Sequence, residues 1–252
     1  MKTASDEGQN QVSLTLTAAS ASGYSSRSKV VLDANASEDY DEAEDAQLLY
    51  DAQLKEVPVV YTVAGDEAVA LNSLPNINWM PLGVVGASSD VESGDAGSSA
   101  NSASVLLAID GISLLSSPLY LYDAATRKYQ EIKDGEEVKV QANEHGRYFL
   151  TQTRNATGIE DAEVGEKSVK IYSPARGLIV VSKIGAPLLN KVEVYTLDGR
   201  LVASRKAEGA ASVSIPVSSL SSSSSSSSQG IYIIKVSVMD THATITRKPS
   251  LR

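Results

Sequence analysis

Cysteine is absent from the 252 residues, and histidine occurs only twice. Without cysteine the chain forms no disulfide, no thiolate zinc site and no cysteine nucleophile. His145 and His242 offer little for a Ser-His-Asp triad or a multi-histidine metal site. No run of about 18 or more apolar residues occurs, so we expect no transmembrane helix. The composition therefore points away from catalysis and from a membrane span.

Positive charge is also scarce, with 22 Lys and Arg against 31 Asp and Glu and a net charge of -9. Such a chain is a poor general binder of nucleic acid or anionic membrane, because both partners carry negative charge. The charge is unevenly spread, at -16 over residues 1–167 and +7 over residues 168–252. This change of sign predicts two modules with different tasks.

Apolar residues make up 42% of the chain, enough for a packed core, and many of them alternate with polar residues. Val12 to Ala18 is typical, because its apolar side chains fall at every second position, as on a half-exposed strand. About nine such stretches separated by turn signals precede residue 155, and about seven follow residue 167. The sequence predicts an all-β chain of two β-sandwich domains, the second Ig-like with about seven strands.

The expected boundaries follow composition. We place an acidic sandwich at residues 1–160, with a mobile loop near 86–102 that is small, polar and non-periodic. A linker is expected at 161–168, and the Ig-like sandwich at 169–252. Residues 221–228 are an uninterrupted serine run, which predicts a flexible loop inserted into the second sandwich.

The second module carries the clearest local signals. Val192 and Val194 alternate with polar residues, and Asp198-Gly199 follows at once. Asp-Gly between two strands predicts a hairpin with a type I′ turn, which needs φ > 0 at both positions. The apolar stretch 230–238 predicts a central strand that is buried on both faces.

Six carboxylates fall within residues 38–45. Asp39, Asp41 and Asp45 are candidate ligands of Ca²⁺, because hard cations bind several oxygen atoms on a flexible loop. The spacing lacks the central glycine and the final glutamate of an EF-hand, and a solvated acidic loop is the favoured interpretation. A short helix with an acidic first turn, running into Leu48, is a third interpretation. No other cofactor is expected.

Trp79 is the only tryptophan. Exposed on a sandwich face it could stack on a sugar ring or anchor a protein partner. Its apolar neighbours Ile77 and Leu82 favour a place in the core instead.

The order of motifs in residues 169–252 resembles the C-terminal sorting domain of the type IX secretion system of Bacteroidetes. That family shows a strand of the form V-x-V-Y-x-L, a turn such as D-G-R, a later G-I-Y-x-x-K-V strand, and a terminal strand with Lys or Arg. The matching residues are Val192, Val194, Tyr195, Leu197, Asp198, Gly199, Arg200, Gly230, Ile231, Tyr232, Lys235, Val236, Arg247 and Lys248. The serine run departs from the pattern, because the family joins its short leucine segment directly to Gly-Ile-Tyr.

This resemblance implies a secreted or cell-surface protein whose tail is an address read by a receptor. The implied partners are the outer-membrane translocon and a sortase-like peptidase that removes the tail, for which the acidic stretch 155–166 is the natural site of cleavage. An export signal is then expected upstream of this fragment, because Met1 is not followed by the apolar core of a signal peptide.

The first module also resembles a β-sandwich, one that precedes such tails in large adhesin-like Bacteroidetes surface proteins. The resemblance rests on Asp33 to Asp45, Val60 to Asp66, Leu74-Pro75, Leu82 to Val84, Leu119 to Asp123 and Gly146 to Leu150. It implies a non-catalytic module that contacts a glycan or a host surface protein.

Two other functions remain open from the residues. One is a carbohydrate-binding sandwich of a larger glycan-acting protein, with or without a stabilising calcium ion. Trp79 would be its stacking platform. The other is an enzyme fragment that uses a pair such as Asp39 and Asp41. Nothing in the sequence positions such a pair as acid and base, so we expect no enzyme.

Overall fold

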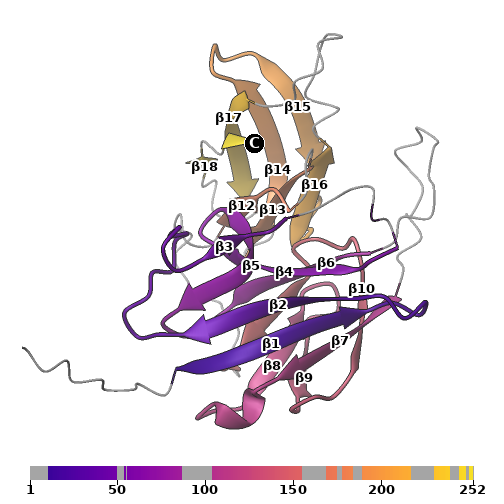
Figure 1. The fold of residues 1–252 in the computed structure, drawn as a ribbon. Helices are drawn as coiled ribbons and strands as arrows, with labels where there is room; N and C mark the ends of the chain where they lie inside the picture. Colours follow the sequence, from indigo (N-terminus) through magenta and orange to yellow (C-terminus); the bar gives the residue numbers. More distant parts are fainter. Residues whose placement is uncertain are drawn as a thin grey trace, which may run out of the picture.

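The computed structural model describes residues 11–49, 54, 56–86, 104–154, 169–174, 178–183, 189–216, 230–238, 244–247 and 250–251. These residues form strands, turns and one short 3-10 helix, η1 (Ile112–Leu114), with no α-helix among them. The predicted all-β class is confirmed, and Figure 1 shows the strands gathered into two bodies. The serine run, the linker at 161–168 and all but the first residue of the loop near 86–102 lie outside the described residues.

The first sandwich is built from one 11-stranded sheet with the order β10-β7-β1-β2-β5-β4-β6-β11-β8-β9, and β3 pairs with β5 beside this path. Its strands are β1 (Val12–Ala19), β2 (Ser25–Leu32), β3 (Ala46–Gln47), β4 (Val59–Ala64), β5 (Glu67–Leu74), β6 (Met80–Val85), β7 (Ser104–Asp110), β8 (Leu119–Asp123), β9 (Lys128–Ile132), β10 (Val138–Gln141) and β11 (Tyr148–Thr151). Neighbouring strands are antiparallel except β2 and β5.

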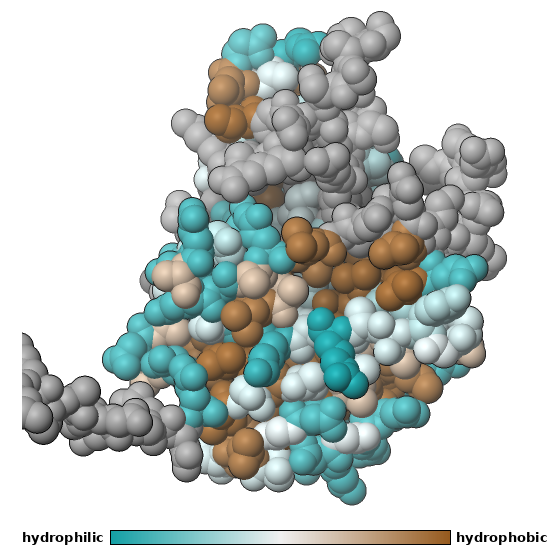
Figure 2. Space-filling model, viewed as in Figure 1, coloured by the Kyte–Doolittle hydropathy of each residue, from teal (hydrophilic) through white to brown (hydrophobic). Residues whose placement is uncertain are grey.

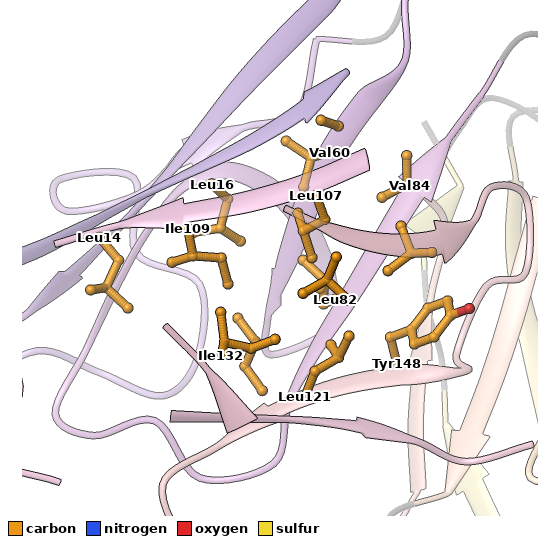
Figure 3. Close-up of a cluster of buried hydrophobic side chains, with 14 of the residues drawn as sticks. Leu14, Leu16, Val60, Leu82, Val84, Leu107, Ile109, Leu121, Ile132 and Tyr148 are labelled. Atoms are coloured by element: carbon orange, nitrogen blue, oxygen red, sulfur yellow. The ribbon is translucent and has the colours of Figure 1, made fainter. Parts of the chain in front are cut away.

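This long sheet bends back on itself around one core. Leu16 on β1 and Ile109 on β7, near one end of the strand order, are both 0% exposed. They belong to the same buried cluster as Leu121 on β8 and Ile132 on β9, at the other end of the order, and Figure 3 shows these side chains converging. Burying apolar surface of this extent is the main favourable contribution to folding.

The second sandwich has two sheets with the orders β12-β13-β16 and β15-β14-β17-β18, and β19 pairs with β17. Its strands are β12 (Val169–Tyr172), β13 (Leu178–Lys183), β14 (Leu189–Thr196), β15 (Leu201–Lys206), β16 (Ser212–Pro216), β17 (Gly230–Val238), β18 (Thr244–Arg247) and β19 (Ser250–Leu251). Both sheets contribute to one core: Ile171 and Ile215 come from the smaller sheet, and Val192 and Ile234 from the larger. The seven predicted strands correspond to β12 through β18.

The two sandwiches meet along a seam. Tyr61 on β4 and Val85 on β6 pack in one buried cluster with Tyr172 on β12 and Val180 on β13. Ser173, next to β12, also forms a parallel bridge with Glu67 on β5. Figure 1 shows the second sandwich standing on the β3–β6 side of the first.

The favoured loop interpretation of the acidic stretch is confirmed, and three local details differ from what the sequence suggested. The acidic stretch forms turns that lead into β3 rather than a helix, because the Asp41 and Asp45 side chains accept hydrogen bonds from backbone N–H groups within the loop. Strand β9 was missed, since its residues are mostly polar. Strand β17 is central, yet only one of its faces is fully buried, and Ile231 on the other face is 51% exposed.

Candidate functional site

The larger sheet of the second sandwich has one face in the core and one face outside, and the motif residues divide between them. Val192 and Val194 on β14 and Val236 on β17 are 0% exposed and belong to the core. Because side chains alternate along a strand, their neighbours in sequence face outward. The core-facing motif residues are therefore part of the fold and are inaccessible to a partner.

The outward motif residues gather where β14 turns into β15. Tyr195 on β14 lies opposite Leu201 on β15 and Ile233 on β17. Leu197 in the turn, Leu201 and Ile231 are 60%, 49% and 51% exposed. We call Tyr195, Leu197, Leu201, Ile231 and Ile233 the free-end patch, because they lie at the end of the sandwich away from the seam.

Figure 2 shows hydrophobic side chains at this free end, at the top of the view. Apolar side chains that neighbour one another on a surface mark an interaction site more often than single exposed ones do. The free-end patch is thus the strongest candidate for an interaction site on the described surface of the second sandwich.

Charged groups border the patch on the same face. Glu193 accepts a hydrogen bond from Lys191 Nζ at 2.5 Å and from Tyr195 Oη at 3.1 Å. The hydrogen bond with Lys191 lowers the pKa of the Glu193 carboxyl and raises the pKa of the Lys191 ammonium, so both groups stay charged at neutral pH. Lys235 lies opposite Glu193 on β17. An apolar centre with a charged border is the usual composition of a protein-binding surface.

The turn at Asp198-Gly199 forms the predicted hairpin but in a different geometry. Gly199 has φ of +84°, while Asp198 does not have a positive φ. Gly199 N–H donates to Thr196 C=O, and Thr196 N–H donates to Arg200 C=O. This pattern is a three-residue loop with a left-handed glycine, and not the expected two-residue type I′ turn.

The Asp198 carboxylate accepts a hydrogen bond from Thr196 Oγ1, which holds the loop in place. Three further motif residues lie in the larger sheet: Gly230 and Tyr232 on β17 and Arg247 on β18. Tyr232 packs against the core. Lys248 lies outside the described residues.

The candidate calcium ligands do not converge. Asp45 accepts from the backbone N–H groups of Asp41 and Ser73, at 2.9 and 2.7 Å, and so ties the acidic loop to β5. Asp41 Oδ1 accepts from Ala43 N–H. No group of three or more acidic or histidine side chains suited to a metal ion occurs within the described part of the chain. The carboxylates of Asp41 and Asp45 therefore stabilise the conformation of the acidic loop.

Trp79 is 7% exposed, so it offers no open ring face for stacking on a sugar. It is buried, as its apolar neighbours favoured, but among other residues than expected. Its ring makes edge contacts with Tyr122, Tyr129 and Phe149, with centroids 4.9, 6.1 and 6.1 Å away. Trp79 also has a positive φ of 55°, which is costly for a bulky residue and is held by this aromatic packing.

The seam contains a polar pair that the sequence did not indicate. Tyr61 Oη and His145 Nδ1 share a hydrogen bond of 2.8 Å, and Tyr172 lies edge-on to the Tyr61 ring at 6.3 Å. Burial lowers the pKa of His145 to about 4 and raises the pKa of Tyr61, so both groups are neutral at neutral pH. The three residues are distant in sequence and follow no shared periodicity, so no local signal could have brought them together.

The loop that carries His145 also contacts the second sandwich. A Cβ on Gly146 would lie 2.8 Å from the Cβ of Ser212 and 3.0 Å from that of Ser182. Gly146 also has φ of +72°. Only glycine therefore fits this close approach without displacement of the two sandwiches.

No helix among the described residues is long and apolar enough to cross a membrane. No protein-family model matches the chain, and a search of curated proteins finds no match.

Proposed function

We propose that the chain is the non-catalytic C-terminal part of a secreted or cell-surface adhesin-like protein. The second sandwich acts as a sorting signal for outer-membrane translocation by the type IX secretion system. The first sandwich is delivered with it to the cell surface.

One observation supports this proposal most. The residues that resemble the sorting motif divide into a set that builds the core and a set that is displayed. Tyr195, Leu197 and Ile231 belong to the displayed set and lie together in the free-end patch. A receptor that reads a folded address needs such an exposed and ordered group of side chains. The positive charge of residues 168–252 adds steering toward an anionic receptor.

The carbohydrate-binding alternative is less well supported. Its stacking platform was Trp79, and the faces of that ring are covered by protein. Tyr24 is 47% exposed, but it lies in the turn between β1 and β2, and no other aromatic ring among the described residues contacts it.

The proposal is tested by export of the full chain behind a signal peptide in a bacterium that has the type IX system. Surface exposure is measured by protease accessibility in intact cells. We expect the chain on the surface in this host, and in the periplasm of the same host without the translocon. A variant that lacks residues 243–252 should also stay in the periplasm, because it loses β18 and β19, which both pair with β17. Surface exposure without the translocon, or periplasmic retention of the intact chain, would contradict the proposal.

A further inference from the structure

A cavity of about 460 Å³ opens at the seam, on the side of the acidic loop. Strands β4, β5 and β6 of the first sandwich form its apolar floor, with Val63, Leu74 and Met80 all at least nine-tenths buried. Val169 and Lys170 on β12 form the wall from the second sandwich. Its volume is in the range of pockets that bind small molecules or single side chains, roughly 300–1,000 Å³.

Asn72 gives the cavity a buried polar group. It lies on β5, is 3% exposed, and lines the cavity. Its side-chain Nδ2 donates two hydrogen bonds, to Thr62 Oγ1 at 3.1 Å and to Met80 Sδ at 3.6 Å. The described residues provide no donor for Asn72 Oδ1. This oxygen is not among the fully buried side-chain atoms that lack a partner, so it is open to a donor from a ligand or from solvent.

The rim of the cavity adds acceptors that carry negative charge. Glu38, Asp39 and Asp66 line it, against the single positive charge of Lys170. The rim is fixed, because Gly65 N–H donates to Glu38 C=O at 3.0 Å. Ionised carboxylates only accept hydrogen bonds. A matching ligand must therefore be rich in donors, and the net negative rim favours a cation.

We propose that this cavity binds a guanidinium group carried on a short apolar chain, the chemistry of an arginine side chain. A guanidinium presents five N–H donors in one plane and is weakly hydrated, so it can meet several acceptors at once. Its methylene stem matches the apolar floor beside Leu74 and Met80. Because Val169 and Lys170 form one wall, the site is complete only while the second sandwich is attached.

The full chain is titrated with Nα-acetylarginine amide and with agmatine, and binding is followed by calorimetry. Nα-acetylcitrulline amide is the neutral isostere, and methyl glucoside tests for a sugar site. We expect both guanidinium compounds to bind at least tenfold more tightly than the citrulline compound. Tighter binding of the acetylarginine amide than of agmatine indicates a peptide source, and the reverse a free amine. Binding should weaken as salt is raised, since the rim is open to solvent.

Asp39→Asn and Glu38→Gln should each weaken guanidinium binding several-fold, and the double variant at least tenfold. Both side chains are exposed, so these variants keep the fold. Glu131→Gln, an exposed carboxylate on β9 away from the cavity, is the matched control and should bind as the parent does. Asn72→Leu should weaken binding in any preparation that melts cooperatively. Equal binding of citrulline, preference for the glucoside, or unchanged binding in the Asp39/Glu38 double variant would overturn the proposal.

Discussion

The two sandwiches share an all-β architecture but place their large apolar side chains differently. In the first sandwich, the exposed ones come from four separate segments, and the rest fill a core that spans nearly every strand. In the second, Leu197, Leu201 and Ile231 are all about half exposed or more, and strand pairing brings them to one end of one sheet. The first sandwich is also acidic, whereas the second is basic.

This difference shows that burial alone does not explain where the second sandwich places its large apolar side chains. A residue whose only task is to stabilise a fold gains about 25 cal/mol for each Å² of apolar surface that it buries. The free-end patch forgoes much of this gain, while the same strands bury Val192, Val194 and Ile234 completely. We infer that one face of the sheet serves stability and the other serves recognition.

The largest expected effect separates the two faces of β17. Ile234→Ala should cost about 2–5 kcal/mol of the free energy of unfolding, because it leaves a cavity in the core. The adjacent Ile233→Ala should cost less than about 1 kcal/mol, because Ile233 is half-buried on the outer face. Urea unfolding of the two variants measures the contrast. Equal losses would remove the distinction between the faces.

The seam should make stability depend on pH through His145. Its pKa is about 4 in the folded chain and 6.5 in the unfolded chain. Between these values the unfolded state binds a proton that the folded state does not. Stability is therefore fully present above pH 6.5 and falls as the pH drops toward 4, by up to about 3 kcal/mol.

Urea unfolding at several pH values checks this expectation. His145→Gln serves as the control and should remove this part of the slope between pH 6.5 and 4. The neighbouring Tyr61 and Tyr172 hydroxyls stay neutral over that range, because burial raises their pKa values. An unchanged slope in His145→Gln would show that the seam histidine is not buried as described.

A smaller effect is expected at Gly83, which lies opposite Tyr61. A Cβ on Gly83 would come within 2.2 Å of the Tyr61 ring, so Gly83→Ala must push that ring toward the second sandwich. Overpacking of this kind costs about 1–3 kcal/mol. Thermal unfolding measures the loss of stability, and tyrosine fluorescence reports the environment of the Tyr61 ring. Gly23→Ala, where nothing lies within 4 Å, should cost less and leave the seam intact.

The smallest effect is expected in the hairpin turn. Gly199→Ala forces a Cβ into a backbone with φ of +84°, but nothing lies within 4 Å of it. The cost should be about 1 kcal/mol, measured by urea unfolding. Gly199→Asn should recover part of it, because asparagine tolerates the left-handed region better. A loss in Gly199→Ala as large as that of Ile234→Ala would mean that the turn specifies the sheet.

Local signals in the sequence predicted most of the strands, and contacts between distant residues explain most of what was missed. Alternation placed Leu14 and Leu16 on a buried face, and both are 0% exposed. The Asp-Gly pair predicted the hairpin, but the hydrogen bond from Thr196 to the Asp198 side chain accompanies a three-residue loop that composition does not reveal.

The seam was not predictable in this way. Tyr61 and His145 meet because β4, β6 and β11 are neighbours in the first sheet, and the second sandwich covers them. This strand order is not visible in the local sequence around either residue. The cavity beside Asn72 depends on the same packing. The free-end patch is intermediate. Tyr195, Leu197 and Ile231 were singled out by resemblance, whereas Leu201 and Ile233 join them only through the register of β14 with β15 and β17.

The most direct test of the central claim is surface delivery of the full chain with Leu201→Ser and Ile231→Ser together. These exposed substitutions should change stability by less than about 0.5 kcal/mol each, so the second sandwich stays folded. The matched control carries Tyr24→Ser and Leu114→Ser, two exposed apolar residues of the first sandwich. We predict that the free-end variant accumulates in the periplasm while the control reaches the surface. Equal delivery of the two folded variants would contradict recognition through the free-end patch.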